Sequence, residues 1–405
     1  MKFFNSLAFK FFLAGFVAFL MLIPLALIEH QVDERRGRAY QVTEDISRDW
    51  GMAQTVSGPC LNFMYEVSDK DPEGKPIVKK VRRKVYPEDL KVDAEISTQT
   101  LHRSIYDVTV YQTDMSLTGN IIVPDELLSV GGKCQIELGV SDLRGIVGEA
   151  AFTLGDGSYR FTDSEDAVLF KELDLKQLGD LQQGIPFDMK LRVKGSRSLF
   201  FRPVGGITEV SIKGNCPDPS FSGDFLPSER EVGDDGFTAS WIVSQINRGG
   251  PEESSFGVRL LDKVSQYQQT TRTLKYGILI ILLVFVAGLF LELTGKKKIN
   301  IVQYMVIGLS LVLFYALVLA FSEFIPFWAA YALAAVMTTL ALYGYFRGIL
   351  RDNTAYALVA MVAIAYILGY VLVQMETYAL LAGTLILFAI LAVIMYLTRN
   401  LNQKV

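Results

Sequence analysis

The chain has 405 residues, of which 51% are hydrophobic and 20% charged, and its formal net charge is −4. A net charge this small excludes the electrostatic footprint of a nucleic-acid-binding protein or of a protein that takes an acidic substrate. The composition averages two unlike parts, because charged residues crowd between positions 29 and 275 and are rare over 276–397. This division predicts one water-exposed domain and one membrane domain.

The first 28 residues are predicted to form a cytoplasmic end and a first membrane span. Lys2 and Lys10 precede an apolar run at about 11–28, which is long enough to cross a bilayer. A cleaved signal peptide is the alternative, but residues 29–33 contain no pair of small residues for cleavage. We therefore expect an uncleaved anchor, in which Pro24 is tolerated.

Residues 29–273 are predicted to form a β-rich, sandwich-like domain inserted after the first span. The domain opens with a helix over 31–50, because Val42, Ile46 and Trp50 recur every four residues, and Gly51 ends this helix. The residues that follow predict a turn at 57–59, a first strand at 61–65 and a loop at 69–75.

Alternation of apolar and polar residues predicts the remaining strands. It is clear over 90–96 and over 106–110, but it changes phase before 113–117, which predicts a bulge or a strand break. Further strands are expected at 136–140, 191–193, 210–212 and 237–243. Many short strands with glycine-rich turns favour an antiparallel sandwich or a pair of sheets.

Residues 274–405 are predicted to form a membrane domain with a cytoplasmic C-terminus. The five apolar spans lie at about 275–293, 301–321, 327–346, 354–374 and 378–397. The lead-in at 267–276 passes without a break into the first of them, and we expect it to couple the two domains rigidly rather than as a flexible linker.

Basic residues mark alternate connections of the membrane domain. They occur at 296–298, at 347 and 351, and at 399 and 404, whereas 322–326 and 374–377 carry none. By the positive-inside rule, the chain has six spans with both termini in the cytoplasm and residues 29–273 outside it. The exceptions are four arginines close to the membrane on the outer side, at 35, 36, 38 and 272, which the long translocated domain and the consistent short loops outweigh.

The spans carry no ionisable residue at depth, since Glu292, Glu323 and Glu376 lie at ends or in connections. This absence disfavours an ion- or proton-coupled transporter, but it leaves a channel or a passive lipid path open. A conduit requires the mild polar side chains to converge, and hydrogen bonding within or between helices is the structural alternative. These side chains are Gln303, Ser310, Thr338, Thr339 and Thr384.

Cysteine and histidine are scarce. Cys60, Cys134 and Cys216 fit no metal motif, and they allow either one disulfide with one free thiol or three buried thiols. The two histidines are His30 and His102, of which only His102 lies where a catalytic base could serve the exported domain.

Two short motifs have residue types that occur in catalytic sites. Residues 139–142 (GVSD) resemble half of a nucleophile elbow around Ser141, but the following glycine is missing. Asp234 and Asp235 stand in a glycine-flanked turn, where loop capping is favoured over paired-carboxylate catalysis. We therefore expect no catalytic, cofactor-binding or metal-binding residues and no cofactor.

Several motifs follow one another in order along the chain. They are 103–111 (RSIYDVTVY), 117–119 (LTG), 139–146 (GVSDLRGI), 219–227 (PSFSGDFLP), Arg230, 236–241 (GFTASW), 256–258 (FGV), 267–268, 270–272 and 275–276. Together they resemble the CreD family of inner-membrane proteins over nearly the whole chain, with the same membrane plan. Cys216 departs from the family pattern, in which a tryptophan precedes the proline, so a disulfide there would not be a family feature.

The resemblance implies a multi-pass protein of the bacterial cell inner membrane that supports cell-envelope integrity. In the family this role is linked to induction by a two-component system and to tolerance of β-lactams and colicins. The resemblance implies no defined activity and provides no catalytic residues. The glycines and aromatic residues of the motifs are expected in turns and in the sandwich core.

Three functions follow as hypotheses. The first is a non-enzymatic protein whose periplasmic domain binds an envelope protein, a peptidoglycan-related partner or membrane lipid, and no nucleic acid. The alternatives are a membrane conduit or flippase-like lipid transporter and, more weakly, an envelope hydrolase. A binding module predicts an exposed apolar patch on the sandwich. A conduit predicts a polar groove, and a hydrolase predicts a polar pocket around His102 or Ser141.

Overall fold

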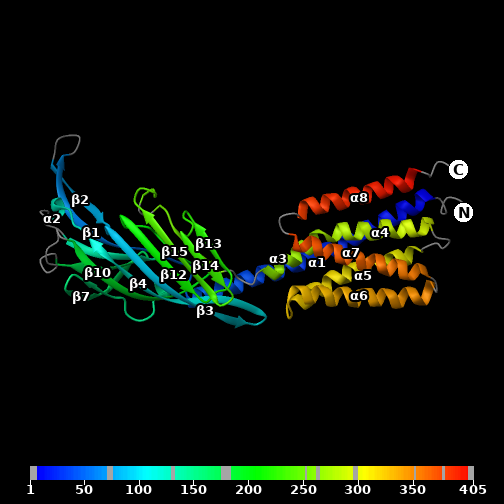
Figure 1. Ribbon diagram of the computed structural model, residues 1–405, viewed down its shortest axis with the longest axis horizontal. Coiled ribbons are helices and arrows are strands. Elements are labelled where there is room, and N and C mark those ends of the chain that lie inside the picture. The colour runs from blue at the N-terminus through cyan, green and yellow to red at the C-terminus, as the bar shows by residue number, and fades with distance from the viewer. Residues whose placement is uncertain are drawn as a thin grey trace. The chain divides into compact units, whose positions relative to one another are not determined.

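A computed structural model describes residues 7–70, 76–128, 133–174, 184–250, 253–260, 265–294, 300–350, 353–375 and 379–399. The chain divides into two compact units. The first unit contains Met1–Tyr40 and Val264–Val405, and the second contains Gln41–Lys263. The first is helical and the second is rich in strands (Figure 1).

The strand-rich unit contains two sheets of eight strands each. The order in the first sheet is β13 (Pro219–Gly223), β16 (Phe256–Leu260), β11 (Ser198–Phe201), β1 (Gln54–Lys70), β5 (Lys133–Val140), β9 (Val168–Leu173) and β8 (Asp163–Glu165), with β2 (Pro76–Val85) paired to β1. The order in the second is β14 (Glu229–Gly233), β15 (Gly236–Ser244), β12 (Ile207–Gly214), β3 (Asp89–Arg103), β4 (Tyr106–Ile121), β10 (Ile185–Ser196), β6 (Ala151–Leu154) and β7 (Gly157–Arg160). A short helix, α2 (Asp125–Leu128), and a 3-10 turn, η2 (Leu143–Gly145), lie in connections.

The expectation of purely antiparallel sheets is wrong at two places. β1 runs parallel to β11, and β12 runs parallel to β3. A parallel pair needs a long crossover, and here each pair joins strands more than 100 residues apart. Alternation along one strand contains no information on the direction of its neighbour, so the sequence pattern is the same in either arrangement.

One hydrophobic core is shared by both sheets. The predicted apolar positions 90, 92, 94 and 96 of β3 are all buried, as are those of β5, β10, β12 and β15. Trp241 is 1% exposed, and its ring centroid lies 5.9 Å from that of Phe221 and 5.5 Å from that of Phe256. The Trp241 indole N–H donates to the Phe225 carbonyl at 3.2 Å. The motif aromatics 221, 225 and 241 therefore build the core, as expected.

The predicted bulge or break between 110 and 113 is absent from β4. The strand pairs with β3 and β10 in unbroken register. Its phase changes because it buries two different faces along its length: Val108 and Val110 pack against Ile46 near the end of helix α1, whereas Met115 and Leu117 enter the main core. When a strand buries different faces along its length, its pattern of apolar residues changes phase although its backbone is regular.

The predicted turn at 57–59 lies inside β1. The Gly58–Pro59 peptide bond is cis, and the pairing of β1 with β5 shifts register between Ser57 and Cys60. The strand absorbs these residues as an irregularity and continues to Lys70. Of the loop predicted over 69–75, residues 69 and 70 end β1 and 71–75 lie outside the described residues.

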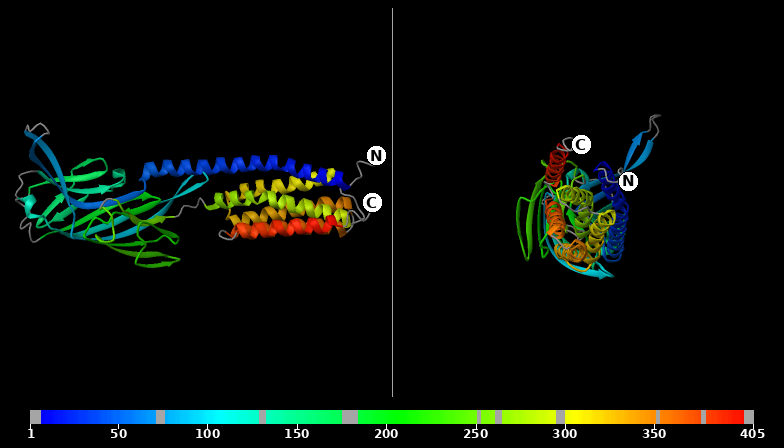
Figure 2. Two further views of the ribbon diagram at one scale, coloured as in Figure 1. Left: turned by 90° about the horizontal axis from the view of Figure 1, so that it is seen from above. Right: turned by 90° about the vertical axis from the view of Figure 1, so that its right-hand side faces the viewer.

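The N-terminal span and the helix predicted over 31–50 form one helix, α1 (Leu7–Trp50), with Pro24 inside it (Figure 2). Gly51 follows it with a φ of 151°, and a Cβ there would lie 2.6 Å from the Lys194 carbonyl oxygen. Glycine therefore ends this helix because no other residue fits the conformation or the space.

The helical unit matches the predicted spans closely. Its further helices are α3 (Ser265–Lys275), α4 (Gly277–Thr294), α5 (Ile301–Ser322), α6 (Phe327–Leu350), α7 (Asn353–Gln374) and α8 (Ala379–Arg399). The lead-in at 267–276 falls largely in α3, whose Thr270 and Thr273 are buried against the bundle. Among the described residues, five stretches are long and apolar enough to cross a membrane; they begin in α1, α3, α5, α6 and α7. A sixth span at α8 is not among them.

Truncation of Trp241 tests the shared core. Trp241→Ala is expected to lower the free energy of unfolding by about 3–5 kcal/mol, because it empties the space between the two sheets. Trp241→Phe keeps a ring there and should lose less. Denaturant unfolding of the full-length protein, followed by the circular dichroism of its strands, measures both, and an unchanged midpoint for the alanine variant would contradict this account.

Candidate functional site

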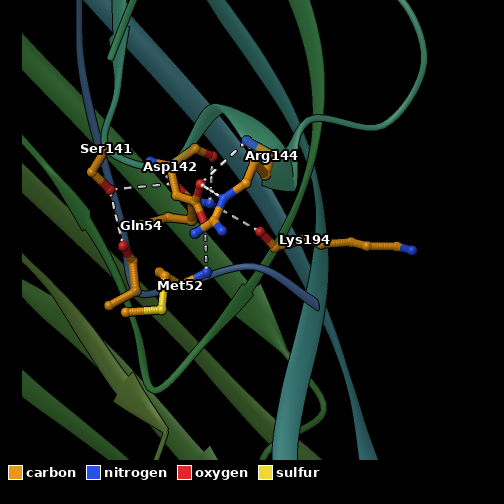
Figure 3. A network of polar contacts seen from close by, with 7 residues as sticks. Met52, Gln54, Ser141, Asp142, Arg144 and Lys194 are labelled. Atoms are coloured by element: carbon orange, nitrogen blue, oxygen red, sulfur yellow. Dashed lines mark hydrogen bonds and ion pairs between the residues drawn. The ribbon is translucent and has the colours of Figure 1, made fainter. Parts of the chain in front are cut away.

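The SDLRG segment at 141–145 enters a polar network with the start of β1 and the end of β10 (Figure 3). It is the motif most characteristic of the resemblance, so its geometry decides whether it is a ligand site. β5 ends at Val140, and η2 turns the chain back toward β1 immediately afterwards.

Gln54 is the centre of this network and is fully buried. Its side-chain amide N–H groups donate to the Asp142 carbonyl at 3.1 Å and to the Lys194 carbonyl at 3.0 Å. Its oxygen accepts from the Asp142 amide at 3.2 Å and faces the Ser141 hydroxyl at 3.3 Å. One amide side chain thus uses both donors and its acceptor to join three chain segments.

Asp142 holds the same segments with its carboxylate. It accepts from the Met52 amide at 2.9 Å, from the Arg144 amide at 3.2 Å and from the Arg144 guanidinium at 3.0 Å. Burial raises the pKa of this carboxyl, but the bonds from Arg144 and Met52 and the charge of Arg144 outweigh it, so the pKa lies below its usual value. Asp142 is therefore a fixed anion that caps η2.

Gly145 allows the close approach of these segments. A Cβ at this position would lie 2.3 Å from the Lys194 carbonyl oxygen and 2.5 Å from the Gln54 amide nitrogen. Both distances are far inside van der Waals contact. The glycine of the motif is thus required by packing against β10 and not by a ligand.

The end of α1 is fastened beside this network. The Trp50 indole N–H donates to the Tyr111 carbonyl at 3.1 Å, and the Lys194 ammonium lies 4.1 Å from the Trp50 ring centroid. The Tyr111 hydroxyl donates to the Ser198 carbonyl at 2.7 Å, and complete burial raises the pKa of this tyrosine. We name the set Trp50, Gln54, Asp142 and Gly145 the polar knot. Its contacts join the end of α1 and the start of β1 to strands of both sheets.

The polar knot provides no reactive group. The Ser141 hydroxyl donates to the Ala53 carbonyl at 2.9 Å and accepts from the Thr55 amide at 2.9 Å. His102 pairs instead with Asp107 in the exposed turn between β3 and β4. Among the described contacts nothing acts as a base for Ser141. A polar hollow does lie beside Ser141, but its hydroxyl is bonded to backbone groups, so the hollow contains no nucleophile–base pair among the described residues.

A second polar group, not anticipated from the sequence, lines a hollow of about 350 Å³ beside Ser141. Glu137 is 8% exposed and accepts from the Asn62 and Gln135 amides, both at 2.6 Å. The Lys84 ammonium lies 3.8 Å from its other oxygen. The glutamate sits at a polar position of an alternating strand, so the pattern gave no sign that it would be buried.

The three cysteines, left open between a disulfide and buried thiols, are all free and buried. Burial raises the pKa of the Cys134 thiol to about 12 and also raises that of Cys216. Buried thiols of high pKa are poor nucleophiles. Within the described residues, no three His, Cys, Asp or Glu side chains come together as a metal site. Asp234 and Asp235 occupy the exposed turn between β14 and β15.

Most of the mild polar side chains expected to line a conduit bond within their own helix. Ser310, Thr338 and Thr384 each donate to a carbonyl of their own helix, at 2.8 Å in every case. The Gln303 side chain accepts from the Asn300 amide at the start of α5. Among the residues that the structure describes, these contacts match the structural alternative and do not form a polar groove for a conduit.

An exposed apolar patch lies on the outer face of the second sheet. Ile207 of β12 pairs with Ser244, and Ile242 of β15 pairs with Glu209, so the two isoleucines are diagonal neighbours on one face. The Gln245 amide donates to the Gly206 carbonyl at 2.7 Å, which brings Ile246 to the same end. These three side chains, which we call the isoleucine patch, are 50%, 61% and 94% exposed.

Replacement of Asp142 tests the polar knot. Asp142→Asn is expected to lower the free energy of unfolding at pH 7 by about 1–3 kcal/mol, because an acceptor becomes a donor facing buried N–H groups. Since the folded-state pKa is depressed, the wild-type advantage is complete above the unfolded-state value of about 3.9 and is lost as the pH falls through the lower folded-state value. Urea unfolding between pH 7 and pH 3 measures it. Asp235→Asn, in an exposed turn, is the control, and equal losses in both variants would refute the role of the knot.

Comparison with known proteins agrees with the resemblance read from the motifs. The family model described as "Inner membrane protein CreD" matches residues 6–404. The inner membrane protein CreD of Escherichia coli (strain K12) is 30% identical over 416 aligned residues, which cover 95% of this chain and 90% of that protein. The chain is a member of the CreD family of inner membrane proteins.

Proposed function

We propose that the strand-rich domain is an exported binding module that supports cell-envelope integrity by docking an envelope protein at the isoleucine patch. The observation that carries this proposal is the patch itself. Three large aliphatic side chains stand exposed at one end of a face that is otherwise polar. A cluster of this kind is a recognised sign of an interaction surface, whereas single exposed apolar residues are ordinary.

The polar knot supports this reading because it gives the domain a fixed shape without using its outer surfaces. A docking domain needs a rigid scaffold beneath the surface that it presents. Membership of the family supports the proposal that this role includes tolerance of β-lactams, colicins or other envelope stress. In a variant of the proposal, the docked partner is related to peptidoglycan. No cofactor is required for docking.

The orientation proposed for the chain has six spans, both termini in the cytoplasm and residues 29–273 in the periplasm. Arg35, after the first span, forms an ion pair with Glu323, in the connection between α5 and α6, at 3.3 Å. These two segments therefore lie at one end of the bundle. This agrees with connections that lie alternately on the two sides of the membrane. Arg36 and Arg38 pair with Asp33 and Glu34 on the same helix. The basic cluster at 296–298 lies outside the described residues.

Reporter fusions test the orientation. Fusions at Lys297 and Arg347 are expected to read as cytoplasmic, and a fusion at Gly250 is expected to read as exported, because basic residues favour the cytoplasmic side. Paired reporters that are active on opposite sides of the membrane measure each site. An exported signal at Lys297 would overturn the proposed topology.

Photo-crosslinking in living cells tests the docking site. A crosslinking residue in place of Ile246 is expected to capture one discrete envelope protein in the full-length chain. The double variant Ile207→Asp and Ile242→Asp should reduce that product at least tenfold, since it places charge in an apolar contact. A crosslinking residue at Ile105 is the control, because this residue is also exposed but lies in the turn between β3 and β4, at the end of the second sheet opposite the patch. The same product at Ile105, or none at Ile246, would exclude docking at the patch.

A further inference from the structure

The hollow that Glu137 lines lies on the outer face of the first sheet. In the register of β1 and β5, Ser57 lies beside Gly139 and Cys60 lies beside Glu137. These positions alternate with residues 136, 138 and 140, which are buried in the core. The pairing shifts register between Ser57 and Cys60, and Gly139 adds no side chain, so the two strands leave room above them. The volume of about 350 Å³ falls within the range of about 300–1,000 Å³ that pockets for small molecules have.

One oxygen of the buried Glu137 carboxylate has no short hydrogen bond among the described residues. Oε1 accepts from the Asn62 and Gln135 side-chain amides, both at 2.6 Å. Oε2 has only long contacts, with the Cys60 thiol at 4.0 Å and the Lys84 ammonium at 3.8 Å. A charged donor lies about 2.7–2.9 Å from a carboxylate oxygen, and a buried carboxylate needs such bonds. The partners of Oε2 line the hollow, whereas those of Oε1 do not, so Oε2 is the oxygen that lies toward it.

The walls of the hollow carry charges of both signs. Lys84 and Arg202 are the cations, and Glu137 and Asp166 are the carboxylates. Within the part of the chain that the structure describes, Arg202 and Asp166 form no ion pair, either with each other or with another residue. An anion alone would meet both carboxylates, and a cation alone would meet both basic side chains. A ligand that carries one charge of each sign matches the walls.

Backbone hydrogen bonds fix the charged groups at the rim. The Arg202 amide donates to the Val56 carbonyl at 2.9 Å, directly after β11. The Val140 amide donates to the Ala167 carbonyl at 2.9 Å, which holds the turn between β8 and β9 against the end of β5. Asp166 and Ala167 in this turn have φ values of 45° and 66°, which residues other than glycine adopt where surrounding contacts enforce them. The site is therefore preformed.

From these contacts we infer that the hollow binds a small zwitterion of the amino-acid or short-peptide class. The ammonium of the ligand donates to Oε2 of Glu137, and its carboxylate accepts from the Arg202 guanidinium. Burial strengthens the first of these bonds, because few water molecules compete with the ligand. The hollow lies on the first sheet and the isoleucine patch on the second, so this inference is independent of the protein partner proposed there.

Ligand-observed NMR on the full-length protein in nanodiscs tests the site with the dipeptide alanyl-alanine. N-acetyl-alanyl-alanine lacks the ammonium and alanyl-alaninamide lacks the carboxylate. Each is expected to bind at least tenfold more weakly, because it leaves one charged wall unmatched. Glucose, a neutral polar molecule of similar size, is expected not to bind. Absence of dipeptide binding at millimolar concentration, equal binding of the three peptide forms, or binding of glucose in their place would overturn the inference.

Two variants assign the charges of the ligand to residues. Arg202→Gln should bind the dipeptide at least tenfold more weakly and should no longer distinguish it from its amide, while the preference over the N-acetyl form remains. Glu137→Gln should instead lose the preference over the N-acetyl form. Arg103→Gln removes an exposed arginine at the end of β3 in the second sheet and is the matched control, which should bind as the wild type does.

The Arg202 comparison decides the inference even where Glu137→Gln fails to fold. Arg202 has no ion pair with a described residue, so Arg202→Gln is expected to keep the wild-type midpoint of urea unfolding. A folded Arg202→Gln protein that still binds the dipeptide at full strength would contradict the site.

Discussion

The buried amide of Gln54 is the interaction on which the strand-rich domain depends. It joins β1 to the segment after β5 and to β10, and so connects the two sheets at the place where α1 ends. A buried amide tolerates this position only because all of its hydrogen-bonding groups are paired. Gly145 provides the space for that pairing, and Asp142 fixes the backbone beside it. The SDLRG segment therefore connects distant segments of the domain. Its serine and aspartate, which resemble catalytic residues in the sequence, are occupied by these structural hydrogen bonds.

Much of the fold could be predicted because it follows from local patterns. Alternation located β3, β5, β10, β12 and β15, and apolar length located the helices of the bundle. The errors arise where tertiary contacts decide. The phase change in β4 comes from the end of α1 covering one face, and the parallel pairs depend on strands far along the chain. Asp142 and Gly145 of the polar knot lie in a motif that the sequence shows. Nothing in the sequence around Gln54 or Lys194 indicates that they contact this motif, and nothing around Glu137 indicates that it is buried.

Buried polar side chains find their hydrogen-bond partners differently in the helical unit and in the strand-rich unit. In the helices, Ser310 and Thr338 donate to carbonyls of their own helix, whereas the Tyr331 hydroxyl of α6 donates to the Tyr366 carbonyl of α7. In the sheets, polar side chains bridge distant segments. The exposed isoleucine patch lies on the second of these sheets.

The parallel pairing of β1 with β11 has a consequence for biogenesis. The first residues of β1 find their neighbours only at 199–201, and Gln54 finds the Lys194 carbonyl 140 positions further on. At roughly 10 residues per second, an emerging chain waits on the order of 10 s before the central strand of the first sheet can be completed. Hairpins such as β3–β4 can close within microseconds. The domain thus has a high contact order, and its half-built sheet must be shielded from aggregation and proteases until the last strands arrive.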